Sequence, residues 1–292
     1  MTVEQLIRVA ILLSIMLIVL SFALRATWRD ATSLFRNPSL LLRSLLAMNV
    51  LMPIFAATLV GLFTLRPAIA IALLTVAVSP VPPFLPLKQA KVAGEREWEY
   101  IDGLLGATSL LSIVLAPASV VLLGLAFSHH ADIDPLKIAR VVALTVLVPF
   151  ALGLIINHLR PTFAASASPL AGKVGMLLLA VASVPILVKM WPAMMSLIGD
   201  GTLLAIVAFV AVGLAVGHLL GGPDPADRVV LALATPMRHP GVALVVASVT
   251  PAGTKVVAPA LLLYLLVGTI ASIPYVRWRR RIAAARDAAH TR

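Results

Sequence analysis

Cysteine is absent from the 292-residue sequence. Its absence excludes disulfides, thiolate metal sites and cysteine nucleophiles. Charged residues are also scarce, at 12%, whereas a soluble domain carries about 25%. Hydrophobic residues make up 61% of the chain and the mean hydropathy is +1.04. This balance excludes an ordinary soluble domain, and it excludes a disordered chain, which needs low hydrophobicity.

Acidic residues are the scarcer of the two charge types, with 12 Asp and Glu against 23 Lys and Arg. A membrane-embedded enzyme needs a nucleophile beside a base, or clustered carboxylates or histidines. The apolar segments contain no such cluster and no His-x-x-Glu-His pattern, and the chain has no Gly-x-x-x-x-Gly-Lys phosphate loop. We therefore predict that the protein is neither an enzyme nor an ATP-driven pump.

Apolar stretches long enough to cross a bilayer follow one another along the chain. A helix needs roughly 20 apolar residues to span the hydrocarbon core. We expect an all-α polytopic membrane protein with about nine spans, at residues 5–24, 40–64, 67–88, 100–126, 136–158, 171–190, 202–220, 227–249 and 256–276. The longest expected loops are 25–39, 89–99 and 159–170. None of them can hold a soluble domain, so we predict a single transmembrane domain over residues 1–292.

The distribution of basic residues predicts the orientation, because Lys and Arg favour cytoplasmic loops. With nine spans and the C-terminus inside, 16 Lys and Arg fall on the cytoplasmic side and 6 on the other, while Arg238 lies within a span. We therefore expect the N-terminus outside and the C-terminus inside. The tail at 277–292 holds six Arg and one Asp. In this position we expect the tail to contact anionic lipid, and we predict no nucleic-acid partner.

Two of the predicted spans are broken by proline, which lacks an N–H group and clashes with the preceding helical turn. In the third span, Ser79 is followed by four prolines, Pro80, Pro82, Pro83 and Pro86. A regular helix cannot hold four prolines in seven residues, although single prolines are tolerated in membrane helices.

The eighth span is interrupted at Thr235-Pro236 and again at Pro240-Gly241. The two broken spans lie five apart in order, so they cross in opposite directions, which is typical of inverted-topology repeats. Breaks free carbonyls that can bind a cation, and they begin half-helices whose N-termini attract anions. We expect repeat A at about 5–126, a linking span at 136–158, repeat B at about 171–276 and a basic cytoplasmic tail at 277–292.

Several short motifs resemble those of the bile acid:sodium symporter family. They are Ser79-Pro80 with Pro83, Lys88-x-x-Lys91-x-x-Gly94, Tyr100-x-x-Gly103-Leu-Leu, Leu111-Ser-Ile-Val-Leu-Ala-Pro117 and Arg238-His239-Pro240-Gly241. The resemblance implies a panel domain and a core domain whose two unwound helices cross at the substrate site. It also implies sodium-coupled uptake of organic anions, such as bile acids, pantoate or other carboxylates, across the plasma (inner) membrane of a bacterium.

The sequence departs from this family where the resemblance assigns the sodium ligands. In an ungapped registration, the glutamate of the second crossing helix falls at Ala234 and a glutamine falls at Arg238. A Ser-Asn pair in the first crossing helix falls near Leu85 and Pro86. We therefore expect weak or absent sodium dependence, with Arg238 in place of a bound cation.

Arg238 is the main candidate for a functional residue, because arginine at the centre of a span costs about 2.5–3.5 kcal/mol on insertion scales. Two interpretations stay open, and they do not exclude each other. The guanidinium either binds a substrate carboxylate through two parallel hydrogen bonds (bidentate binding) or donates hydrogen bonds to free carbonyls of the other broken helix. His239 either shuttles a proton or bonds to a backbone carbonyl.

The remaining candidate residues are the polar side chains at or near the breaks. The predicted substrate-binding residues are Arg238, His239, Ser79, Pro82, Thr235 and Asn49. The weaker candidates for binding a cation are Thr108, Thr235 and Ser109, of which Ser109 matches a sodium-ligating hydroxyl of the family. We predict no catalytic residue, no metal site and no cofactor, with Na⁺ or H⁺ as the coupling ion of any active transport.

These patterns together favour a secondary active transporter of a small organic anion that works by alternating access. A passive organic-anion channel or facilitator is the alternative, and a membrane-embedded enzyme is the least favoured class. The predicted partners are the anion and the lipid bilayer. The substrate, the direction of transport and the oligomeric state stay open.

Overall fold

The computed structural model of the chain is all-helical in the part that it describes. The described residues are 3–79, 81, 100–101, 103–108, 110–111, 114–115, 118, 140, 143–247 and 253–290. Five helices in this part are long and apolar enough to cross a membrane: Gln5–Ala23, Pro38–Leu62, Pro161–Ser196, Thr202–Leu220 and Val256–Ala285. Two shorter apolar helices occupy Pro67–Val78 and Ala143–Leu159. Nine spans and the inverted repeat stay predictions.

The helices follow the predicted spans closely in several places. The elements are α1 (Val3–Ala23), α2 (Trp28–Ala31), α3 (Ser33–Arg36), α4 (Pro38–Leu45), the π-helical segment η1 (Leu46–Leu51), α5 (Met52–Leu62), α6 (Pro67–Val78), a second π-helical segment η2 (Ala143–Leu147), α10 (Val148–Leu159), α11 (Pro161–Ser196), α12 (Thr202–Leu220), α13 (Pro225–Ala234), α14 (Pro240–Ala247), α15 (Gly253–Ala271) and α16 (Ile273–His290). The bounds of α12 are those predicted.

One expected loop is wrong. Residues 161–170 are not a connection but the first turns of α11, which is 36 residues long. Pro161 begins this helix, where its missing N–H group is not needed. Ser168 is buried against α1 and donates a hydrogen bond of 2.8 Å to the carbonyl of Ser21. Packing on a neighbouring helix thus extends the helix through a polar stretch that hydropathy alone separates from the span.

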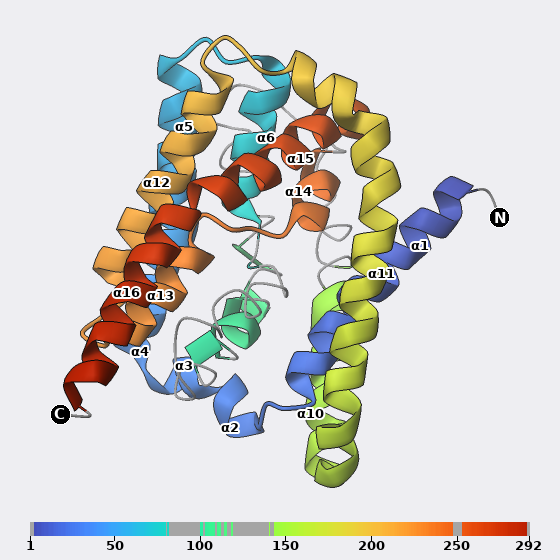
Figure 1. The fold of residues 1–292 in the computed structure, drawn as a ribbon, viewed down its shortest axis with the longest axis vertical. Coiled ribbons are helices and arrows are strands. Elements are labelled where there is room, and N and C mark those ends of the chain that lie inside the picture. Colours follow the sequence, from blue (N-terminus) through green and yellow to red (C-terminus); the bar gives the residue numbers. More distant parts are fainter. Residues whose placement is uncertain are drawn as a thin grey trace.

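The helices form two groups, each with its own buried hydrophobic cluster (Figure 1). In the first group, α1 packs on α10 and α11, and its cluster includes Ile15, Val19 and Phe150. The second and larger group contains α4, α5, α6, α12, α13, α14 and α15. Helix α11 contacts both groups, since Met194 near its end belongs to the larger cluster. The panel and core parts that the family resemblance implies stay a prediction.

Two glycines on α12 allow the core helices to approach closely. Gly213 and Gly217 are four residues apart and therefore lie on one face of the helix. A Cβ atom on Gly217 would lie 2.6 Å from the Cα atom of Ala232, and one on Gly213 would lie 2.8 Å from Cβ of Pro236. Small residues at this spacing let membrane helices touch through their backbones. Gly213 and Gly217 therefore allow the broken segment to pack directly against α12.

The breaks occur where the prolines predict them. Helix α6 ends at Val78, and Ser79 is extended, as expected for a residue that precedes a proline. Helix α13 ends at Ala234, and α14 begins at Pro240, where the sequence predicts the two interruptions of this span. Proline suits the first turn of a helix because its missing N–H group is not needed there. Helix α14 packs against both α6 and α15 (Figure 1). The two broken regions therefore meet inside the core group.

A candidate cation cage at the broken helices

The guanidinium of Arg238 lies in the centre of the core group and is 1% exposed. Its Nε donates a hydrogen bond of 3.0 Å to the carbonyl of Thr235, and its Nη1 donates one of 2.9 Å to the carbonyl of Ser79. Its Nη2 donates to the carbonyl of Met48. Three separate elements therefore each direct a backbone carbonyl at one positive charge. We call these three carbonyls the carbonyl cage.

Two of the cage carbonyls belong to helix ends. The last four carbonyls of a helix have no intrahelical partner, and the end as a whole carries a partial negative charge. Ser79 follows the end of α6 and Thr235 follows the end of α13. Because each is followed by a proline, the helix cannot continue and satisfy the carbonyl. A cation at this point is stabilised by both helix ends.

The third cage carbonyl is freed by a local change of helical register. In η1 the Met52 N–H group donates to the carbonyl of Ala47, five residues back, as in a π-helix. In this register the donor for Met48 would be Pro53, which has no N–H group. The carbonyl of Met48 is therefore left for another donor, and the Arg238 side chain supplies it.

A fourth carbonyl at the second break is satisfied by a different side chain. The Tyr264 hydroxyl on α15 donates to the carbonyl of Pro236, and Tyr264 is 3% exposed. Its ring meets that of Phe209 edge-on, with centroids 5.8 Å apart. The irregular backbone of the eighth span is thus held by Arg238 from within and by Tyr264 from the neighbouring helix.

Three candidate hydroxyls lie in the described part of the chain, and each bonds back to its own helix. Ser79 Oγ donates to the carbonyl of Thr75, Thr235 Oγ1 to Leu231 and Thr108 Oγ1 to Leu104, at 2.7, 2.7 and 2.6 Å. This arrangement is common in membrane helices. Each hydroxyl oxygen can still accept a bond or contact an ion, and the cation-binding role of Thr108 and Thr235 stays a prediction.

His239 is buried and lies directly before α14. The Val242 N–H group donates to its Nδ1 at 3.4 Å, so the imidazole accepts a bond from the first turn of the helix. The predicted donation to a backbone carbonyl is not tested by this contact and stays a prediction. The proton-shuttle interpretation stays a prediction.

The remaining candidates are placed only in part. Asn49 is half-buried in η1, next to Met48, and so lies near the cage along the chain. Pro82 and Ser109 lie outside the described residues. The carbonyl of Met48 and the hydroxyl of Tyr264 were missed by sequence reasoning. Pro53 downstream of Met48, and a tyrosine hydroxyl in an otherwise apolar helix, are signals that could have indicated them.

Comparison with known proteins identifies the family. The profile of the sodium bile acid symporter family matches residues 10–197, which is more than half of the chain. The chain belongs to this family. A comparison with curated proteins gave no match.

Membership of the sodium bile acid symporter family gives the general class of activity. The family consists of transporters and not of enzymes, so the chain is a secondary transporter of the bile acid:sodium symporter type. The family and the long apolar helices together identify an integral membrane protein. The matched range ends at Leu197, and Arg238 lies beyond it.

Proposed function

We propose that this symporter-family protein carries a small organic anion by alternating access, with Arg238 in the position of a coupling cation. The observation that carries the proposal is the carbonyl cage, in which backbone oxygens from Met48, Ser79 and Thr235 surround a guanidinium. Backbone oxygens around a positive charge resemble the way unwound helices of other transporters coordinate an ion. Here the charge is attached covalently to the chain.

Electrostatics argues against a second cation beside Arg238. Two unit charges 4 Å apart repel each other by about 4 kcal/mol at an effective dielectric constant of 20. A carboxylate would offset this repulsion, but Ala234 stands at the position that the resemblance assigns to glutamate. Among the described residues, no group of three or more His, Asp or Glu could hold a metal ion. We therefore expect sodium to contribute little at this site.

The same charge favours an anionic substrate. A guanidinium has five N–H donors, and the cage accepts from three of its nitrogens with one bond each. Two N–H groups, one on each terminal nitrogen, can still donate. Helix α14 begins two residues later, at Pro240, and its N-terminus adds partial positive charge. A carboxylate is the substrate group that fits this centre.

A passive facilitator is the second candidate, and the same geometry favours it. A cation that is part of the protein cannot be carried across with the substrate, so it cannot couple uptake to a cation gradient. Transport would then follow the gradient of the anion itself, unless a proton moves through His239. The two candidates differ in whether the anion can be accumulated against its gradient.

A thermal-shift screen of the purified protein against small carboxylates tests substrate class and ion use together. We expect at least one carboxylate to raise the Tm by the same amount in sodium and in potassium. The effect should disappear in Arg238→Ala and persist in Arg160→Ala, because Arg160 is exposed and lies far along the chain. Stabilisation that requires sodium in the unaltered protein would contradict the proposal.

A further inference from the structure

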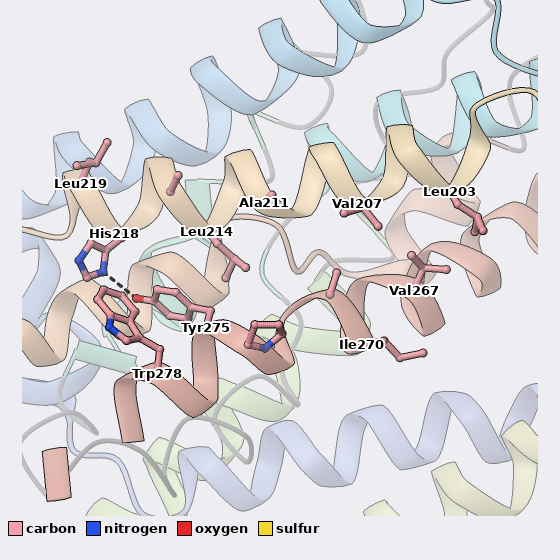
Figure 2. A pocket seen from close by; sticks show the side chains of 13 residues that line it. Leu203, Val207, Ala211, Leu214, His218, Leu219, Val267, Ile270, Tyr275 and Trp278 are labelled. Carbon is pink, nitrogen blue, oxygen red and sulfur yellow. Dashed lines mark hydrogen bonds between the residues drawn. The ribbon is translucent and has the colours of Figure 1, made fainter. Parts of the chain in front are cut away.

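A groove separate from the carbonyl cage runs along the outside of the core group, between α12 and the pair α15–α16 (Figure 2). Its volume is about 780 Å³. Most of its walls are aliphatic, and they are exposed on α12 at Leu203, Val207 and Leu219. From Leu203 to Leu219 the groove follows about 24 Å of helix. This length exceeds one leaflet of the hydrocarbon core, which is about 15 Å.

One end of the groove is polar and aromatic. His218 Nδ1 and the Tyr275 hydroxyl are joined by a hydrogen bond of 2.9 Å, and Trp278 lies beside both rings (Figure 2). Tyrosine and tryptophan gather where the hydrocarbon meets the lipid headgroups. The polar end therefore belongs at the membrane surface, and the aliphatic walls extend from it into the hydrocarbon.

Two arginines, Arg279 and Arg228, contact the aromatic residues at this end. The Arg279 guanidinium lies 5.5 Å from the centre of the Trp278 ring, and its Nη2 donates to the carbonyl of Pro225. Its Nε is buried and has no hydrogen-bond partner in the described part of the chain. Arg228 lies next to this end, since its backbone carbonyl accepts from the Tyr275 hydroxyl at 3.5 Å. Its own Nε donates to the carbonyl of Gly222 at 2.7 Å.

The charge at this end is predominantly positive. Helix α16 carries further arginines in the same turns, at Arg277, Arg280 and Arg281. The acidic side chains at the start of α13 are Asp224 and Asp227. Asp224 already accepts from the N–H group of Ala226. An anion at the polar end would therefore lie beside Arg279, whose Nε has no hydrogen-bond partner in the described part of the chain, and close along the chain to the other arginines of α16.

We propose that this groove binds an anionic phospholipid of the cytoplasmic leaflet. The acyl chain lies along the aliphatic wall of α12, and the phosphate group lies at Arg228 and Arg279. Basic pockets between membrane helices on the cytoplasmic side bind such headgroups. A zwitterionic lipid would fill the wall equally well but would gain less from the arginines.

The lipid would act on the helices that support the second break. Helix α12 contacts Pro236 through Gly213, and α15 holds the same residue through Tyr264. A lipid wedged between α12 and α15–α16 bridges both supports. We therefore expect binding to raise thermal stability, whether or not the carbonyl cage is the transport site.

The test is thermal unfolding of the detergent-solubilised protein during titration with phosphatidylglycerol. Phosphatidylcholine with the same acyl chains and inorganic phosphate serve as parallel titrants. We expect phosphatidylglycerol to bind about tenfold more tightly than phosphatidylcholine, and phosphate alone to have no effect. Equal stabilisation by both lipids, or full stabilisation by phosphate, would overturn the proposal.

Variants separate the groove from general lipid effects. Val207→Trp fills the groove, whereas Leu204→Trp, on the same helix but outside the lining, is its matched control. Arg279→Gln removes the positive side-chain charge that we propose binds the lipid headgroup. We expect loss of the phosphatidylglycerol effect in Val207→Trp and about tenfold weaker binding in Arg279→Gln. An unchanged response in both would refute the site, and Ala211→Met replaces Val207→Trp if that variant does not fold.

Discussion

The Nη1 atom of Arg238 lies 2.9 Å from the carbonyl oxygen of Ser79, 159 residues earlier in the chain. This contact joins the end of α6 to the break between α13 and α14. Burying an arginine away from water costs desolvation free energy. Here three hydrogen bonds to carbonyls that proline has freed offset that cost. The cation and the broken backbone therefore stabilise each other.

Removing the guanidinium should empty the carbonyl cage without removing its oxygens. Each hydrogen bond from a charged group contributes about 1.5–3 kcal/mol, so Arg238→Ala should unfold at a clearly lower temperature. Because the cage then lacks a cation, sodium should stabilise Arg238→Ala more than it stabilises the unaltered protein. Thermal unfolding in sodium and in choline chloride measures this. A sodium response of equal size in both proteins would count against the surrogate-cation account.

Tyr264→Phe should loosen the second break from the outside. The Pro236 carbonyl would lose its only hydroxyl donor in the described part of the chain, and an unsatisfied buried acceptor costs about 1–3 kcal/mol. Tyr100→Phe is a matched control, because the Tyr100 hydroxyl is also buried but pairs with Ser44. We expect only Tyr264→Phe to reduce uptake beyond its effect on stability. Comparable uptake in the two variants at equal folded amounts would contradict the role of Tyr264.

Gly217→Ala should separate α12 from α13. The added methyl group would lie within 2.6 Å of the Ala232 backbone, and overpacking of this kind costs about 1–3 kcal/mol. Gly61→Ala on α5 has no heavy atom within 4 Å of the new Cβ and should leave the Tm unchanged or slightly higher. A urea or thermal unfolding series on both variants checks the difference. Equal Tm values would show that the close approach is not required.

The ion pair of Arg66 and Asp200 provides a test of orientation. Arg66 Nε and Asp200 Oδ2 are 2.9 Å apart, so the loops that carry them share one side, as the predicted alternation of spans requires. Because the chain has no cysteine, single cysteines report their own accessibility. A membrane-impermeant thiol reagent should label Asp200→Cys in intact cells and Ala288→Cys only after permeabilisation. A reporter at Asp134, outside the described residues, should also be external, and a cytoplasmic signal there would refute the nine-span prediction.

The helix boundaries at the breaks were predictable from the sequence, since they depend on residues close together in the chain. The prolines predicted the ends of α6 and α13 and the beginning of α14, and hydropathy predicted α12. The contact partners of Arg238 were predicted only as a class, namely free carbonyls of the other break. Met48 was not among them, because its carbonyl is freed by a π-helical register that forms inside the folded core.

Residues 161–170 show the limit of hydropathy in another way. The segment is rich in Ala and Ser and ends in Pro169 and Leu170, so its mean hydropathy falls between two apolar stretches and indicates a loop. The structure continues the helix because Ala164 and Ser168 are buried, and Ser168 bonds to α1. Tertiary packing decides such segments, and a single sequence does not reveal it.

The central claim is that a covalently held cation has replaced a bound one. The most direct test is carboxylate uptake into proteoliposomes with sodium or potassium outside at fixed pH, using the carboxylate found by thermal shift. We predict equal uptake in the two salts, loss of uptake in Arg238→Ala and partial recovery in Arg238→Lys, which keeps the charge but not the bidentate geometry. A steep sodium requirement that persists in Arg238→Ala would contradict the claim.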